Sequence, residues 1–128
     1  MLIQELSKEY GPRSVVDYYG DTKDTVRAQN IERFQESDST RFFIGNPQTG
    51  GMGITLTASH TVIYYSNSYN LEHRIQSEDR CHRIGQNHKV TYIDLICSNT
   101  VDAKIVAALR SKKQLAGKVL GDEWRTWI

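Results

Sequence analysis

Short apolar stretches alternate along the chain with segments whose apolar residues recur every three or four positions. The apolar stretches are rich in β-branched and aromatic residues, which favours strands, and they span residues 15–19, 41–45, 61–65 and 90–97. The periodic segments predict helices that begin near Leu2, Asp21, Leu71 and Thr100. Because the strands are apolar along most of their length and alternate with helices, the pattern predicts an α/β fold with a parallel sheet covered by helices on both faces.

Residues that cap or break helices sharpen these boundaries. The first helix is expected to end near Gly11 and Pro12, since glycine and proline interrupt helices. Asp21 or Thr22 can cap the second helix, which is expected to run to about Gln35. The apolar positions expected to face inward are Val26, Ile31 and Phe34 on the second helix and Val101, Ile105, Leu109 and Leu115 on the last.

Composition is that of a globular domain in aqueous surroundings. The 128 residues, 38% hydrophobic and 24% charged, fit one domain with one core. No run of roughly twenty apolar residues is present, so no membrane-spanning helix is expected, and the first residues lack the pattern of a signal peptide. The net charge of only +1 argues against a protein that coats nucleic acid with its whole surface, so any such contact must be local.

The cysteines and histidines do not form a metal-binding pattern. Cys81 and Cys97 occur without a C-x-x-C motif, which indicates free thiols and a cytoplasmic protein, or a nuclear one in a eukaryote. The four histidines lack the spacing of metal ligands, so no metal site is expected.

The order of the predicted elements indicates that a strand is missing. The chain opens on a helix, whereas a doubly wound α/β domain normally begins with a strand. We therefore expect either a piece of a longer protein or a domain that lacks an edge strand. Residues 1–120 are expected to form the domain, and residues 121–128 a C-terminal tail.

Two arginines in the run from Gln76 to Gln86 are the strongest candidates for chemistry. If the helix extends from Leu71 to His82, then Gln76, Arg80 and Arg83 share one of its faces. Arginine keeps its charge and presents a fork of donors that fits phosphate oxygens. Such a pair can stabilise the charge that develops during phosphoryl transfer.

A simpler interpretation of the same run is a solvated helix face. Its charges would then be satisfied by Asp79–Arg83 and Glu72–Gln76 pairs, each four residues apart. The position of the helix favours a functional role instead, because ligands of parallel sheets gather at the carboxyl ends of the strands, where this helix begins.

A glycine-rich loop follows the second strand, from Asn46 to Gly53. Glycines allow backbone amides to approach a phosphate or a nucleic-acid backbone, although a tight turn explains them equally well. The loop is not a phosphate-binding Walker A loop, which requires a lysine followed by Ser or Thr. Asp122 and Glu123 imitate the acidic box of nucleotide hydrolases, but no strand precedes them. The chain therefore lacks its own means of holding a magnesium nucleotide.

Together the two motifs resemble a known family. Residues 50–58 and 76–86 are similar to motifs V and VI of the SNF2 family of DNA-dependent ATPases. The resemblance extends through Tyr19-Gly20, the helix from Arg27 to Phe34 and Thr100-Val101-Asp102, and it covers about residues 15–120. The ending His82 to Gln86 favours the SNF2 branch over related RNA helicases, which carry a further Gly-Arg pair.

The resemblance implies the second, C-terminal RecA-like lobe of a two-lobe helicase or translocase. In that family ATP and Mg²⁺ lie between the lobes and are held mainly by the first lobe, while the second lobe supplies arginine fingers. Arg80 and Arg83 would be those catalytic fingers. The complete motor would then be an ATP hydrolase, and this chain alone would be inactive.

Further roles follow from the same resemblance. Gln76, Asp79, Gly51 and Gly53 would bind or couple to the nucleotide, while Thr55 and Gly50 would contact double-stranded DNA. The implied partners are the first RecA-like lobe and a DNA duplex, with no membrane and a monomeric state. The alternative is a free-standing, non-catalytic module that binds DNA or protein.

Overall fold

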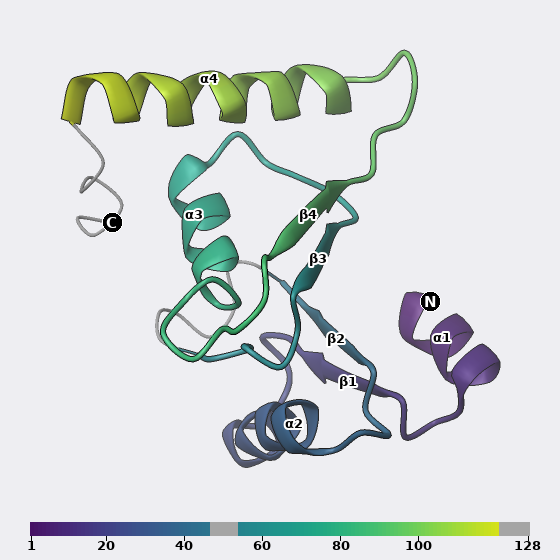
Figure 1. The fold of residues 1–128 in the computed structure, drawn as a ribbon. Helices are drawn as coiled ribbons and strands as arrows, with labels where there is room; N and C mark the ends of the chain where they lie inside the picture. Colours follow the sequence, from purple (N-terminus) through teal and green to yellow (C-terminus); the bar gives the residue numbers. More distant parts are fainter. Residues whose placement is uncertain (47–53, 121–128) are drawn as a thin grey trace.

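The computed structural model describes residues 1–46 and 54–120, with the backbone alone at Leu120. In these ranges the helices and strands follow one another in the order that the sequence predicts (Figure 1). Their bounds are α1 Leu2–Tyr10, β1 Val15–Tyr18, α2 Asp24–Glu36, β2 Phe42–Gly45, β3 Thr61–Tyr64, α3 Leu71–Asp79, β4 Thr91–Asp94 and α4 Asp102–Leu120.

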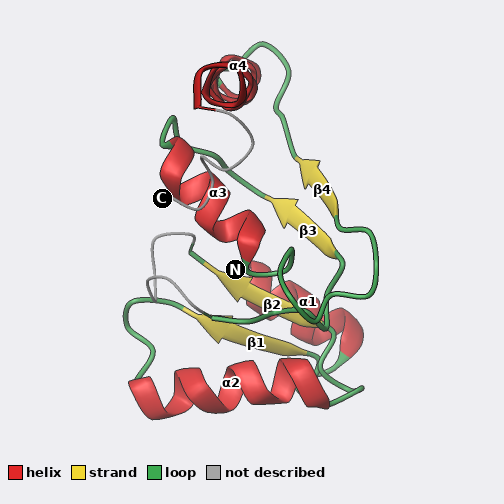
Figure 2. Ribbon diagram, turned by 60° about the vertical axis from the view of Figure 1, so that its left-hand side comes forward, coloured by secondary structure: helices red, strands yellow, loops and turns green. Residues whose placement is uncertain are grey.

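The strands pair in parallel, which confirms the predicted direction of the sheet. β1 pairs with β2 from Val15 opposite Phe42 to Tyr18 opposite Gly45. β3 pairs with β4 from Thr61 opposite Thr91 to Tyr64 opposite Asp94. Figure 2 shows all four arrows pointing toward the same side of the molecule.

Within the described residues the predicted parallel sheet is divided in two. They form two separate two-stranded sheets, and no hydrogen-bonded ladder joins β2 to β3. The alternating pattern predicts where strands form, but pairing depends on which strand edges meet in space, and the periodicity carries no information about that. A cavity between the amino ends of β2 and β3 separates the two pairs at that end.

The pair β1–β2 is covered on both faces, as predicted. Phe43 of β2 lies on the face of Tyr18, and its ring is 5.5 Å from that of Phe34 on α2. Phe42 points to the opposite face because neighbouring residues of a strand alternate. There its ring is 5.1 Å from that of Tyr10 on α1. The two helices therefore enclose this pair.

The pair β3–β4 is covered on only one face within the described residues. Tyr64 of β3 shares a hydrogen bond of 2.6 Å with Ser77 of α3, so α3 packs on this face. On the other face Ile63 and its register partner Ile93 are 59% and 40% exposed. Within the described residues this second face is therefore open to solvent. We call this surface, formed by Ile63 and Ile93, the bare face.

The start of α2 differs from the prediction. Its N-cap is Lys23, whose side chain makes no capping hydrogen bond. Thr22 instead accepts a hydrogen bond from the Tyr19 amide and donates one to Asp17, at 3.2 and 3.1 Å. Its hydroxyl thus closes the turn after β1 and is not available to the helix. Asn30 is the buried residue of α2. Its side-chain amide donates a hydrogen bond to the Asp17 carbonyl at 2.8 Å.

Helix α4 lies beside α3 at the end of the molecule remote from α2 (Figure 1). Ile105 and Leu109 are buried as predicted, together with Val106. Val101 and Leu115 were expected to face inward but are exposed, as is Val26 on α2. Each of these three residues lies on an apolar stripe, but the neighbouring elements cover only part of that stripe.

Candidate functional site

Helix α3 leads into the two arginines of the predicted motif and is well packed against the rest of the molecule. Its N-cap Asn70 accepts a hydrogen bond from the His73 amide at 3.0 Å, which satisfies a backbone donor at the helix start. Ile75 is completely buried, and Ser77 and Glu78 are also buried. The helix thus forms a fixed support for the residues that follow it.

The helix ends at Asp79, earlier than the predicted end at His82. The carbonyl groups of the next two residues accept hydrogen bonds from outside the helix. The Leu56 amide donates to the Arg80 carbonyl at 2.8 Å, and the Gln86 side chain donates to the Cys81 carbonyl at 3.1 Å. The backbone just after α3 is therefore held by groups outside the helix, which a pattern of helical periodicity cannot reveal.

As a result, the two arginines do not share one helix face, and that expectation was wrong. Arg80 is the C-terminal cap of α3 and is only 7% exposed. Arg83 lies beyond the helix and is exposed. Burial lowers the pKa of Arg80 from its usual value, and the nearby Tyr18 and Tyr64 hydroxyl groups partly oppose this effect. Arg83 is therefore the arginine that an external phosphate can reach directly.

The fold brings the two sequence motifs together. Arg83 donates through Nη1 to the carbonyl of Ile54 at 2.9 Å, and the backbones of Arg80 and Leu56 are hydrogen-bonded. Residues 54–60 lead into the amino end of β3. The sequence predicted that the arginine motif lies at the carboxyl ends of the strands, and the structure shows this only in part. Helix α3 begins at those ends. A crossover helix runs back along the strands that it connects, so the end of α3 that leads to the arginines lies elsewhere.

Gln86 is a structural residue that the sequence analysis did not single out. Its Nε2 atom lies within hydrogen-bonding distance of three carbonyl oxygens, those of Thr57, Ser59 and Cys81, at 3.2, 2.8 and 3.1 Å. Its Oε1 accepts from the His88 amide at 3.1 Å. Gln86 thus holds the end of the arginine motif against the segment that leads from the glycine loop into β3. In the sequence, the signal for this structural role was the position of Gln86 at the end of the motif.

The other predicted residues have varied surroundings. Gln76 donates to Glu72 at 3.1 Å, the pair expected for a solvated helix face. Asp79 is partly buried at the end of α3, and Thr55 is partly buried next to the Ile54 contact of Arg83. The predicted residues Gly50, Gly51 and Gly53 lie outside the described residues.

Next to the arginines, the Cys81 thiol is shielded from solvent. Burial raises the pKa of Cys81 to about 11, although the Arg80 charge opposes this effect. A thiol reacts through its thiolate, so at pH 8 only about one Cys81 in a thousand is reactive. The second cysteine, Cys97, is exposed.

We therefore expect a thiol reagent such as Ellman's reagent to modify only Cys97 in the native chain at pH 8. The number of thiolate groups released, read from absorbance, measures the labelling. In a Cys97→Ser variant, labelling should be absent until urea unfolds the protein. Rapid labelling of that variant in native buffer would show that Cys81 is accessible.

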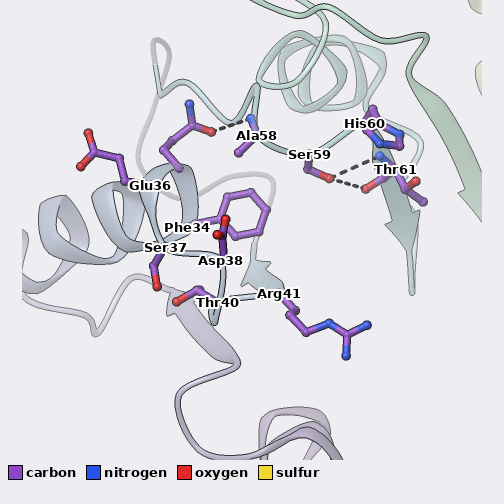
Figure 3. Close-up of a pocket in the computed structure, with 11 residues that line it drawn as sticks. Phe34, Glu36, Ser37, Asp38, Thr40, Arg41, Ala58, Ser59, His60 and Thr61 are labelled. Atoms are coloured by element: carbon purple, nitrogen blue, oxygen red, sulfur yellow. Dashed lines mark hydrogen bonds between the residues drawn. The ribbon is translucent and has the colours of Figure 1, made fainter.

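A cavity of about 380 Å³ lies between the end of α2 and the segment before β3 (Figure 3). Its wall includes Glu36, Asp38, Arg41 and His60. None of the predicted site residues that the structure describes lines it. Gln35 closes one side by accepting a hydrogen bond from the Ala58 amide at 2.7 Å. The cavity is therefore separate from the arginine motif.

Among residues 1–46 and 54–120, no group of three or more His, Cys, Asp or Glu side chains could hold a metal ion. In the same part of the chain, no helix is both long enough and apolar enough to span a bilayer.

Comparisons with known proteins agree with this geometry. Residues 1–85 match the model of the helicase conserved C-terminal domain. The chain is 39% identical to the lymphoid-specific helicase of Homo sapiens over 70% of this chain and 11% of that protein. It is 36% identical to the chromatin-remodeling ATPase INO80 of Mycosarcoma maydis over 80% of this chain and 5% of that protein.

A solved structure extends the likeness to three dimensions. The crystal structure of the C-terminal part of the Fun30 ATPase domain superposes with a TM-score of 0.75 and 30% identity, over 84% of this chain and 34% of that chain. The fold is thus that of a C-terminal RecA-like lobe. The chain belongs to the helicase conserved C-terminal domain family, as the C-terminal lobe of an SNF2-family helicase.

Proposed function

We propose that this chain is the second lobe of an ATP-driven translocase on double-stranded DNA. In this proposal Arg83 and Arg80 act as arginine fingers toward an ATP that a first lobe holds. The observation that carries it is the exposed Arg83 guanidinium at the junction of the two motifs, tied to the Ile54 carbonyl at 2.9 Å. The chain spans 11% and 5% of the two relatives described above, so the complete activity requires further residues.

The residues of the arginine segment fit this role in different ways. Arg83 uses Nη1 for the Ile54 carbonyl, and the rest of its fork of donors can face a phosphate. Arg80, which is buried, would act from behind it through its positive charge. Arginine fingers stabilise the charge of the phosphoryl-transfer transition state, a charge that a guanidinium can meet without moving a proton.

The nucleotide itself is proposed to be held mainly outside this chain. No phosphate-binding Walker A motif is present in the sequence, and the described residues offer no cluster of ligands for Mg²⁺. Bound ATP would supply the phosphoryl group, and the Mg²⁺ ion bound with it would supply positive charge. The proposed task of this lobe is to orient the guanidinium groups and exclude water from the gap when the lobes close.

The remaining proposed roles concern DNA and coupling. Thr55 follows Ile54 directly, so a contact of Thr55 with a phosphate of the duplex would lie close to Arg83. Gly50 is proposed to contact the same backbone. Gln76 and Asp79, together with Gly51 and Gly53, are proposed to link DNA contact with closure on the nucleotide. Such local contact agrees with the net charge of +1.

We expect the isolated 128-residue chain to show no measurable ATP hydrolysis, with or without duplex DNA, because it lacks a phosphate cradle. The measurement is phosphate release, with circular dichroism to show that the chain is folded. The complete protein under the same conditions is the positive control, and it should respond to DNA. Robust DNA-stimulated turnover by the pure chain would refute the proposed division of labour. Absence of turnover in the complete protein would favour a binding module instead.

A further inference from the structure

A partly buried group of polar side chains joins α3 to β4 and α4. We call it the Arg74 cluster, and its members are Asn67, Arg74, Glu78, Asp94 and Lys113. Arg74 donates through Nη1 and Nη2 to the two Asp94 oxygens at 2.6 and 3.2 Å, and through Nε to Glu78 at 3.2 Å. Glu78 also accepts from Lys113 on α4, at 2.8 and 3.0 Å. The loop with Asn67, strand β4 and helices α3 and α4 thus meet at the guanidinium of Arg74 and the carboxylate of Glu78.

Other contacts fix the plane of the guanidinium. It lies over the Tyr64 ring, 3.6 Å from the centroid. Asn67 accepts from Arg74 at 2.8 Å and donates to Asp94 at 2.9 Å, which closes a triangle of hydrogen bonds. Burial favours a raised pKa for Asp94, but the hydrogen bonds from Arg74 and Asn67 outweigh it, so the pKa is lowered and the carboxylate stays ionised.

Stability alone does not explain such a cluster. The side chains of Arg74 and Asp94 are each 10% exposed, and that of Glu78 is 3% exposed. Replacing a buried ion pair by packed apolar residues is often neutral or stabilising, because the charges must be stripped of water. A bidentate arginine contact adds geometric specificity instead, since the planar fork meets a carboxylate in one orientation. The cluster therefore specifies how α3 is rotated and placed.

Rotation of α3 matters because its carboxyl end continues into the arginine segment. Arg80 caps the helix, and Arg83 follows within the same turn region. Tyr92 of β4 donates to the Glu78 carbonyl at 3.2 Å, so the last turn of α3 is also fixed against the sheet. A change at Arg74 would therefore be carried through a rigid helix to Arg83.

We propose that Arg74 is a positioning residue that sets the placement of the arginine segment, and that Lys113 extends this control to α4. The inference rests on the proposed function, because it assigns Arg74 a role through Arg83. A catalytic group displaced by about 1 Å can lose about 10²-fold in rate even when the mutation is distant. The cluster is suited to prevent such a displacement.

The test uses Arg74→Lys in the complete protein, because lysine keeps the charge but not the fork. The readout is the rate constant for cleavage of ATP in a single turnover, with the protein in excess, which does not depend on the folded fraction. We expect a fall of about ten- to a hundredfold, with the KM for ATP within about twofold of the wild-type value. Arg33→Lys on α2 is the matched control and should cleave ATP at the wild-type rate.

A rate for Arg74→Lys equal to that of Arg33→Lys would overturn the proposal, whatever its melting temperature. If Arg74→Lys does not fold, Asp94→Asn replaces it under the same criterion. Lys113→Met tests the link to α4, with Lys104→Met, exposed on the same helix, as its control. We expect a several-fold slower turnover only in the first of these two, and equal rates would remove α4 from the proposal.

Arg83→Ala, measured in parallel, separates this inference from the proposed function. Near-normal turnover by Arg83→Ala would overturn the arginine-finger proposal and, with it, a positioning role toward Arg83. Loss of turnover by Arg83→Ala combined with a wild-type rate for Arg74→Lys would overturn the positioning role alone.

Discussion

Replacing Arg83 with alanine is expected to abolish ATP turnover by the complete protein while leaving its fold intact. An arginine finger contributes about 10³–10⁵ in rate, which corresponds to roughly 4–7 kcal/mol of the barrier. Arg83 is exposed and its side chain makes a single hydrogen bond within the described residues, to the Ile54 carbonyl. Its truncation therefore removes a charge without leaving a cavity in the protein interior.

The measurement is the steady-state rate of phosphate release at saturating ATP and DNA. Arg33→Ala, an exposed arginine on α2, is the control and should retain turnover. Arg80 would be a poor choice for this experiment, because it is 7% exposed and its removal would also disturb packing. If Arg83→Ala hydrolysed ATP at nearly the normal rate, Arg83 would not be a finger.

The second large effect is expected for stability. Ile75 of α3 has no exposed surface at all, and truncating a buried isoleucine to alanine costs about 2–5 kcal/mol through lost burial and the cavity left behind. We expect Ile75→Ala to lower the free energy of unfolding of the 128-residue chain by this amount. Urea unfolding followed by circular dichroism gives the value.

Ile63 provides a matched control for this experiment. It is the same residue type but is 59% exposed on the bare face, so Ile63→Ala should change the free energy of unfolding by no more than about 0.5 kcal/mol. Equal losses for the two variants would mean that Ile75 is not part of the core.

The order and type of the elements could be predicted from the sequence because they depend on local patterns. The strands beginning at Val15, Phe42, Thr61 and Thr91 all lie within predicted stretches. Helix α1 ends at Tyr10, and Gly11 follows with a φ of 97°, a conformation that suits glycine. Such signals lie within a few residues of the structure that they specify.

Features that depend on distant partners could not be predicted. The backbone of Arg80, just after α3, is hydrogen-bonded to Leu56, which is remote in the sequence. The bare face carries apolar residues that suit a covered strand, yet Ile63 is exposed. Apolar character shows that a side chain can be buried, not that a neighbouring element covers it.

The arginine motif was recognised from the sequence, but the group of side chains that holds it was not. Arg74 and Glu78 are four residues apart and look like an ordinary surface pair. The overlooked signal was Asp94, an acidic residue at the end of the apolar strand β4. An acid in such a place requires a buried partner, and Arg74 is that partner.

The bare face also affects how the folded chain responds to heat and denaturant. Unfolding raises the heat capacity in proportion to the apolar surface that it newly hydrates, and urea sensitivity scales with the surface exposed. Ile63 and Ile93 are already 59% and 40% exposed in the folded state, so they add less to either quantity than fully buried residues would. The stability of this chain should therefore vary more gently with temperature and urea than that of an equally long domain whose strands are sheltered on both sides.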